Sequence, residues 1–167
     1  MGTRALVPVE EYLATEYEPD CDYVDGELVD RNVGEKDHSK VQTRLTAVLF
    51  NQRGKLGIHV FTEQRVRIGP RRFRVPDICV VVGKEPEEQV FTAPPFLCIE
   101  VLSPEDRASR VQEKLDDYFA FGVQCVWVID PRRRRAYIHS TSGVMEAKEG
   151  LETDDPKISV DLREIFE

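Results

Sequence analysis

The sequence lacks the motifs of several common enzyme and metal-binding classes. Its four cysteines, Cys21, Cys79, Cys98 and Cys125, form no CxxC pair and have no histidine cluster near them, which argues against a zinc site. It also has no glycine-rich phosphate loop, no nucleophile elbow and no Cys–His arrangement for nucleophilic catalysis. The sequence therefore does not support a metabolic α/β enzyme of another class.

Long apolar runs are absent as well. No run approaches the roughly 18 residues that a membrane-spanning helix needs. Arg4, Glu10 and Glu11 interrupt any stretch that would resemble a signal peptide. We therefore expect a soluble, cytoplasmic protein with no membrane partner. Three of the four cysteines lie inside apolar runs, which predicts that they are reduced core residues.

An excess of positive charge is also missing, since the formal net charge is -8. A protein that coats DNA electrostatically would be basic, because phosphate neutralisation dominates nucleic-acid affinity. Any nucleic-acid binding must therefore use a local patch. An arginine-rich hairpin tip can recognise phosphate, but it can equally be a solvated surface. Proteins that bind single strands place aromatic residues between such basic residues, and this sequence does not. The candidate patches are Arg65, Arg67, Arg71, Arg72 and Arg74, and a second cluster at residues 132–135.

The apolar residues, 41% of a chain of 167, suit one domain over residues 1–167 with a hydrophobic core. Apolar periodicity predicts helices over residues 8–15, 37–53, 105–121 and 161–166. Asp37 and Ser103 are the expected N-caps of the two long helices, and Gly57 (or Gly54) and Gly122 the expected ends. Asp25-Gly26 predicts an early hairpin. Strand-like runs cover residues 59–68, 73–82, 96–102, 123–130 and 135–139.

This order of elements predicts a mixed α/β sheet. The strands before the second long helix should pair as a meander, and the strand after it can join in parallel through the crossover helix. The expected fold is therefore a mixed central sheet flanked by helices. An N-terminal hairpin, one or two C-terminal strands and a short closing helix decorate it.

Two carboxylates interrupt apolar strands where a charge is costly to bury. Asp77 lies in the run 75–82 and Glu100 in the run 96–102, on strands that we expect to be neighbours. Magnesium prefers oxygen ligands and often uses one or two carboxylates together with water and phosphate. The pair is therefore a candidate Mg²⁺ site. The alternative is that each acid pairs with an arginine, such as Arg74 or Arg107, or lies at a strand end.

Lys114 lies at the margin of the apolar stripe of the second long helix. It follows Val111 by three positions and precedes Tyr118 by four, so it should face inward more than its neighbours do. A lysine beside two carboxylates and a phosphate would stabilise charge that develops in the transition state. The alternative is a surface lysine that lays its aliphatic stem on the apolar stripe.

The order and spacing of these residues resemble the Uma family of endonucleases, a branch of the PD-(D/E)XK, or restriction-endonuclease-like, superfamily. The resemblance covers nearly the whole chain, including His38 at the start of the first long helix. It rests on Tyr23-Val24-Asp25-Gly26-Glu27-Leu28, Val75-Pro76-Asp77, Ile99-Glu100-Val101-Leu102-Ser103-Pro104, Lys114, Tyr118, Gly122-Val123 and Val126-Trp127-Val128-Ile129-Asp130-Pro131.

The resemblance implies a fold and a set of metal ligands. The superfamily core is an αβββαβ unit, and its mechanism makes Asp77 and Glu100 metal ligands, with the Val101 carbonyl as a third oxygen. The superfamily lysine normally stands two residues after the second acid, where this sequence has Leu102. Family resemblance therefore suggests that the lysine role has moved to Lys114.

Further residues are candidates for contacting the substrate or orienting the ligands. His38 should reach the cleft from the first long helix, although a histidine flanking the core would look the same. Glu63, on the strand beside Asp77, would supply a third carboxylate or simply be solvated. Tyr118 would orient Lys114 or lie in the core, and Arg74 shares a predicted hairpin with Asp77.

The leading hypothesis is a Mg²⁺-dependent endonuclease that hydrolyses DNA phosphodiester bonds, with Mn²⁺ as a substitute ion. The alternative is a nuclease fold kept as a nucleic-acid-binding or assembly module without turnover, which the displaced lysine and the acidic net charge favour. Cutting a duplex needs two active sites or two visits, so a homodimer is expected.

Overall fold

A six-stranded mixed sheet lies at the centre of the computed structural model, which describes residues 5–31 and 34–167. Its strands are β3 (Ile58–Thr62), β6 (Ile78–Val82), β7 (Leu97–Val101), β8 (Cys125–Asp130), β9 (Arg135–Ser140) and β10 (Gly143–Ala147). They are ordered β10-β9-β8-β7-β6-β3. β7 and β8 are parallel, and the other neighbours are antiparallel. The predicted meander and crossover are confirmed.

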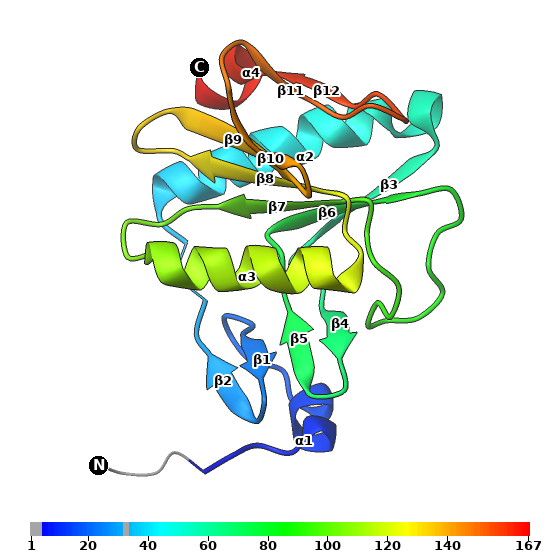
Figure 1. The fold of residues 1–167 in the computed structure, drawn as a ribbon, viewed down its shortest axis with the longest axis vertical. Helices are drawn as coiled ribbons and strands as arrows, with labels where there is room; N and C mark the ends of the chain where they lie inside the picture. Colours follow the sequence, from blue (N-terminus) through cyan, green and yellow to red (C-terminus); the bar gives the residue numbers. More distant parts are fainter. Residues whose placement is uncertain (1–4, 32–33) are drawn as a thin grey trace.

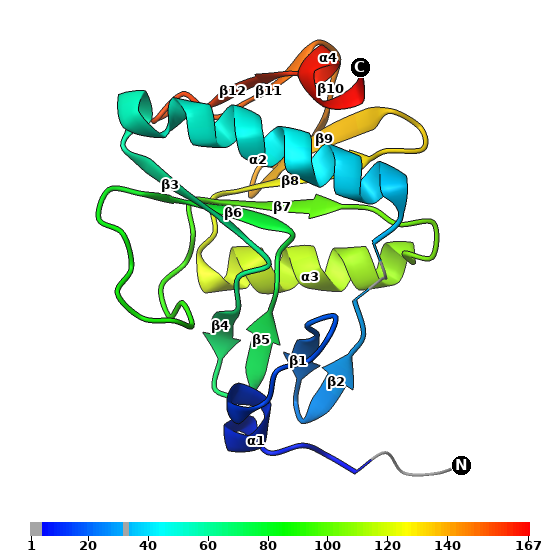
Figure 2. The ribbon, with the colours of Figure 1, turned by 180° about the vertical axis from the view of Figure 1, so that it is seen from behind.

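Two long helices, α2 (Lys36–Leu56) and α3 (Ala108–Phe121), cover opposite faces of this sheet. α3 crosses the face seen in Figure 1, and α2 crosses the face seen in Figure 2. Because side chains alternate along a strand, Ile99 packs with Leu45 of α2, whereas the adjacent Cys98 packs with Leu115 of α3. The predicted α/β architecture is confirmed.

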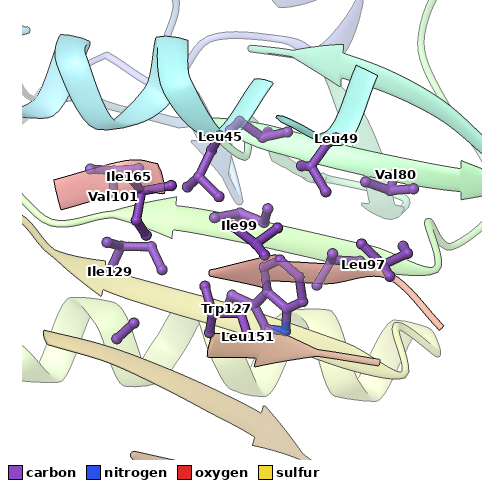
Figure 3. Close-up of a cluster of buried hydrophobic side chains, with 14 of the residues drawn as sticks. Leu45, Leu49, Val80, Leu97, Ile99, Val101, Trp127, Ile129, Leu151 and Ile165 are labelled. Atoms are coloured by element: carbon purple, nitrogen blue, oxygen red, sulfur yellow. The ribbon is translucent and has the colours of Figure 1, made fainter. Parts of the chain in front are cut away.

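The larger core lies between α2 and the sheet (Figure 3). Leu45 and Leu49 of α2 are fully buried with Ile99 and Trp127 of the central strands. Burying one such side chain contributes about 1.5–3 kcal/mol. All four cysteines are free, as expected, and Cys79 and Cys98 are fully buried. The apolar runs of the sequence therefore form the sheet's two packed faces.

The predicted strands over residues 59–68 and 73–82 are each broken in the middle, so the prediction of continuous strands is wrong. Glu63 adopts a left-handed backbone with φ 50°, and Pro76 has no N–H to donate to a ladder. The end of the first run and the start of the second run leave the large sheet. They form β4 (Val66–Gly69) and β5 (Arg72–Arg74). The break leaves Asp77 just before β6.

A second, smaller sheet is built on these outer parts. It has the order β2-β1-β5-β4, with β1 (Asp22–Val24) and β2 (Glu27–Val29) forming the predicted hairpin. Asp25 (φ 51°) and Gly26 (φ 99°) both have positive φ, as a type I′ turn requires. Tyr12 of α1 (Val9–Ala14) stacks on Tyr23 of β1 with ring centroids 4.9 Å apart.

The predicted N-caps of both long helices are wrong. α2 begins at Lys36, and neither Asp37 nor another side chain caps it. α3 begins at residue 108 instead of 105 and also has no side-chain cap. For α3 the reason is a local turn, in which the Ser103 N–H donates to the Asp106 carboxylate at 2.6 Å. That turn delays the helix.

The predicted helix ends are confirmed. α2 ends at Gly57 with φ 62°, and α3 ends at Gly122 with φ 113°. Glycine adopts this left-handed conformation without the steric penalty of a Cβ atom. The Gly122 N–H donates to the Tyr118 carbonyl and so closes the last turn of α3.

The C-terminal segment has three strands instead of the predicted one or two. β10 forms an edge of the large sheet, and β11 (Gly150–Glu152) pairs with β12 (Ser159–Asp161) in a separate two-stranded sheet. The predicted closing helix is confirmed as α4 (Leu162–Phe166), which Asp161 and Glu164 cap as a capping box. No helix within residues 5–31 and 34–167 is long and apolar enough to cross a membrane.

Candidate active site

The two candidate carboxylates lie opposite each other on neighbouring strands. Ile78 of β6 pairs with Ile99 of β7 in antiparallel register, which places Asp77 across from Glu100. The side chain of Asp77 reaches β7, since its Oδ2 accepts the Val101 N–H at 2.8 Å. Asp77 is 5% and Glu100 6% exposed. The structure therefore brings together the two buried acids that the sequence singles out.

Asp77 is held by the side chains of Arg31 and His38 as well as by the backbone. Arg31 donates to its Oδ1 at 2.6 Å, and His38 Nε2, at the start of α2, lies 3.4 Å from the same oxygen. Burial alone would raise the pKa of Asp77, but His38, Arg31 and the Val101 N–H outweigh it, and the pKa falls below its ordinary value. Asp77 is therefore a carboxylate at neutral pH.

Glu100 meets Lys114 and Tyr118, both from α3. Lys114 Nζ lies 3.2 Å from Oε2, and the Tyr118 hydroxyl donates to Oε1 at 2.6 Å. Complete burial raises the pKa of Glu100, Lys114 lowers it and Asp77 raises it again, so the pKa lies above its ordinary value. Burial would lower the pKa of Lys114, but the charges of Glu100, Asp22 and Asp77 raise it above its ordinary value.

The inward position expected for Lys114 is confirmed. Its side chain is 21% exposed, whereas that of the adjacent Glu113 is 50% exposed. Tyr118 is fully buried, so it is at once a core residue of α3 and a hydrogen-bond partner of Glu100. Lys114 contacts the second acid even though Leu102 occupies the position where the superfamily lysine normally stands.

Asp22 is a buried acid of this site that the sequence analysis missed. Its Oδ2 lies 3.7 Å from Lys114 Nζ and accepts from Arg74 at 3.1 Å, while its Oδ1 accepts the Val75 N–H. Arg74 also pairs with Asp117 of α3 at 2.6 Å. A three-residue strand is too short for its alternation to reveal a buried charge. Asp22 and Arg74 together connect the small sheet to the helix that carries Lys114.

Arg31 is the second residue that the sequence analysis missed. It stands between two polar residues after β2, a context in which an arginine is commonly solvated, so no local pattern marks it. Its side chain is nevertheless only 10% exposed and pairs with Asp77. The alternative in which an arginine pairs with the acid is therefore partly met, although by Arg31. Arg74 pairs elsewhere, and Arg107 is exposed.

Glu63 lies beside Asp77 through its backbone, not through its carboxylate. Its N–H donates to the Asp77 carbonyl at 3.1 Å. The carboxylate is 54% exposed and lies 4.0 Å from Arg31 Nη1. The position next to Asp77 is as expected, but the side chain is largely in solvent.

The first arginine cluster is largely engaged inside the protein. Arg65 forms a two-pronged pair with Asp20, and Arg72 pairs with Asp117 at 2.7 Å. Such internal pairs leave fewer guanidinium donors for phosphate. The second cluster, at residues 132–135, lies exposed on the turn between β8 and β9.

The central polar groups line one cleft between the small sheet and the N-terminal ends of α2 and α3. It is lined by Arg31, His38, Asp77, Glu100 and Lys114, among others. Its volume is about 60 Å³, which admits a few water molecules. Within residues 5–31 and 34–167, no three or more His, Cys, Asp or Glu side chains are grouped to hold a metal ion. The buried acids of the cleft lining are therefore the pair Asp77 and Glu100.

Comparisons with known proteins agree with this fold. A solved structure from Anabaena variabilis ATCC 29413, described as a "putative nuclease belonging to DUF820", superimposes with a TM-score of 0.81. The two chains are 20% identical, and the match covers 94% of this chain and 96% of that one. No curated protein matches the chain. The likeness shows that the fold is that of this nuclease-like structure.

A family comparison covers almost the whole sequence. Residues 9–164 match the Uma2 family model, which is described as "Putative restriction endonuclease". The match includes both long helices, both carboxylates and Lys114. The fold and the match together support a nuclease-like function, and the chain belongs to the Uma2 restriction-endonuclease family.

Proposed function

We propose that this protein is a Mg²⁺-dependent endonuclease that hydrolyses phosphodiester bonds of DNA. Asp77 and Glu100 would hold the ion, and Lys114 would stabilise the charged transition state. The observation that carries the proposal is the pair of buried acids in opposite register with a lysine 3.2 Å from one of them. Burying two carboxylates side by side is costly for stability, which argues for a role in binding.

The donor set suits magnesium in type and number. Mg²⁺ takes hard oxygen ligands, and one or two protein carboxylates with water and substrate phosphate commonly suffice. Asp77 and Glu100 would supply the carboxylates, and the Val101 carbonyl is the proposed third oxygen. When bound, such an ion neutralises phosphate charge and lowers the pKa of water at the site.

Lys114 would act as a fixed positive charge and not as a base. Its raised pKa keeps it protonated at neutral pH, because Glu100 and Asp22 surround it with negative charge. A positioned cation in a partly dry cleft stabilises the charge that grows on a phosphate during attack. Tyr118 would hold Glu100 in place through its 2.6 Å hydrogen bond. This arrangement supports the idea that Lys114 replaces the lysine missing at Leu102.

The test is cleavage of plasmid DNA, single-stranded DNA and RNA with Mg²⁺ or Mn²⁺. We expect Asp77→Asn and Glu100→Gln to lose cleavage while circular dichroism shows an intact fold. Glu10→Gln, which removes an exposed charge on α1, is the control and should cleave normally. The proposal fails if the wild-type protein cuts none of these substrates, or if both site variants cut as fast as the control.

One observation favours a second candidate, a nuclease fold that binds nucleic acid or a partner without turnover. Every oxygen of Asp77 and Glu100 already accepts from a protein donor, so the acids are satisfied without a metal. Calorimetry with Mn²⁺ separates the candidates. Binding that is lost in Asp77→Asn supports the enzyme, whereas no binding by the wild-type protein supports the module.

The proposal includes a cytoplasmic homodimer. Cutting both strands of a duplex requires two active sites or two binding events, and a symmetric pair of subunits is the common solution. Sedimentation equilibrium with and without a short duplex would measure the mass. A monomer in both conditions would remove the dimer from the proposal.

A further inference from the structure

Arg31 is the cation that contacts Asp77 in the acidic cleft. Its Nη2 lies 2.6 Å from Asp77 Oδ1, and its side chain is 10% exposed. Its only other acidic partner within 4.0 Å among the described residues is Glu63, whose carboxylate is 54% exposed. Arg31 lies outside the helices and strands, just after β2. One strong contact therefore fixes it in the cleft.

A divalent ion that binds the two acids would meet the positive charges of Arg31 and Lys114, which already contact these carboxylates. Asp77 Oδ1 accepts from Arg31, and its Oδ2 accepts from the Val101 backbone. The two oxygens of Glu100 accept from Lys114 and Tyr118. Backbone and buried aromatic donors are fixed by the fold. His38 Nε2, which lies 3.4 Å from Asp77 Oδ1, projects from the first turn of α2. Among the donors with long, flexible side chains, Arg31 and Lys114 are therefore the exchangeable ones.

Arg31 is the easier of the two to displace. Lys114 has Glu100 at 3.2 Å and the fully buried Asp22 at 3.7 Å, so it keeps an acidic partner if one contact is lost. Among the described residues, Arg31 would keep within 4.0 Å only the exposed Glu63. Lys114 also projects from the middle of α3, whereas Arg31 belongs to a connecting segment. Metal entry at Asp77 should therefore release Arg31 first.

A released guanidinium needs a new anion, because an unpaired charge in a nearly buried site is costly. A phosphodiester is the anion that the proposed reaction brings into this cleft, and the planar guanidinium matches phosphate with two parallel hydrogen bonds. Asp77 would exchange a guanidinium for a metal ion, and Arg31 would exchange a carboxylate for a phosphate. Both partners of the broken pair would then be neutralised again.

We propose that Arg31 is a substrate-phosphate ligand that blocks metal binding at Asp77 until a phosphodiester draws it away. This proposal rests on the proposed function, since it takes Asp77 as a metal ligand. It implies that metal and DNA bind cooperatively. Either one must break the Arg31–Asp77 pair when it binds alone, and once the pair is broken the other binds without that cost. By linkage, each must raise the affinity of the other by the same factor.

Calorimetric titration of Mg²⁺ tests the proposal, with and without a short DNA duplex. Ca²⁺ replaces Mg²⁺ wherever gels show that the duplex is cut. We expect the duplex to raise the metal affinity of the wild-type protein at least about fivefold. In Arg31→Met, the metal alone should bind roughly 10- to 100-fold more tightly than to the wild type, the equivalent of one hydrogen bond between charged groups. The duplex should then raise the metal affinity by a smaller factor than it does in the wild type, because only the contribution of Arg31 is lost.

Arg107→Met is the matched control, because it removes the same charge from an exposed position outside the cleft lining. It should keep the wild-type affinity and the wild-type effect of the duplex. Equal metal affinity in Arg31→Met and the wild type would overturn the exchange while leaving the metal site intact. No metal binding by either protein, with or without DNA, would instead overturn the proposed metal site itself.

Arg31→Lys carries the test if the methionine variant does not fold. Lysine keeps the charge but lacks the two-pronged geometry for phosphate. We expect tighter metal binding than in the wild type, because the contact with Asp77 weakens, and a smaller effect of the duplex. A lysine variant with both wild-type values would overturn the role of Arg31.

Discussion

Replacing Arg74, which lies outside the cleft lining, with methionine should destabilise the protein strongly. The Arg74 side chain is 3% exposed and pairs with Asp22, which is 1% exposed, and with Asp117, which is 11% exposed. Methionine fills much of the same volume but removes the nearest cation from both carboxylates. Asp117 then keeps Arg72 at 2.7 Å, and Asp22 keeps Lys114 at 3.7 Å. Removing one partner of a buried ion pair costs about 3–5 kcal/mol. That is a large part of a typical unfolding free energy of about 5–15 kcal/mol.

The assay is urea unfolding followed by the fluorescence of Trp127, the single tryptophan, which is fully buried. In a thermal scan the same loss corresponds to roughly 6–20 °C, because 1 kcal/mol shifts the melting temperature of a protein of this size by about 2–4 °C. Arg107→Met, an exposed change of the same kind, should remain within about 0.5 kcal/mol of the wild type.

A second substitution tests the cause of the destabilisation. Asp22→Asn removes the more buried of the two carboxylates that lose Arg74, and its amide oxygen can still accept the Val75 N–H. The double variant should therefore be more stable than the sum of the single effects by at least about 1 kcal/mol. A loss below about 1 kcal/mol in Arg74→Met, or strict additivity, would refute the assignment of Arg74 as a buried charge partner.

Three further substitutions probe the site and the core. Tyr118→Phe should cost about 1.5–3 kcal/mol in urea unfolding, because Glu100 loses its 2.6 Å hydrogen bond; an unchanged midpoint would contradict this. The hydrogen bond to Asp77 raises the pKa of His38, so His38 adds stability that is present below pH about 6.5 and lost as pH rises through its folded pKa. The stability difference between wild type and His38→Gln should therefore shrink from pH 6 to pH 9, and a constant difference would exclude this linkage. Leu45→Ala, at a fully buried position of α2, should cost about 2–5 kcal/mol through the cavity it creates, and a loss like that of a surface change would show a core that collapses.

The identity and order of the main elements follow from local sequence patterns. Apolar runs and helical spacing report how an element buries its own faces, so the central sheet, both long helices and the crossover are predictable. Asp77 and Glu100 stand out for the same reason, because a charge inside an apolar run conflicts with the burial of its neighbours. Gly57 and Gly122 mark helix ends because few other residues adopt their backbone conformation easily.

Element starts and strand breaks depend on competition between neighbouring interactions. Ser103 has the chemistry of an N-cap, yet its own N–H binds the Asp106 carboxylate and the chain turns before α3 begins. The run that contains Pro76 reads as one strand, but it divides between two sheets. The conformational preferences of single residues cannot decide between a capped helix start and a turn, because the two differ by only about 1 kcal/mol.

The sequence by itself therefore determined the fold class, the two buried acids and the inward lysine of this protein. Only the tertiary structure decided which charges meet them. Arg31 reaches Asp77 across 46 positions, and Asp22 reaches Arg74 across 52. Arg31 and Asp22 lie in short, polar surroundings that carry no periodic pattern, so nothing local predicts their burial. Ion pairs between distant residues form only after packing brings the elements together, and these pairs set the charge state of the cleft.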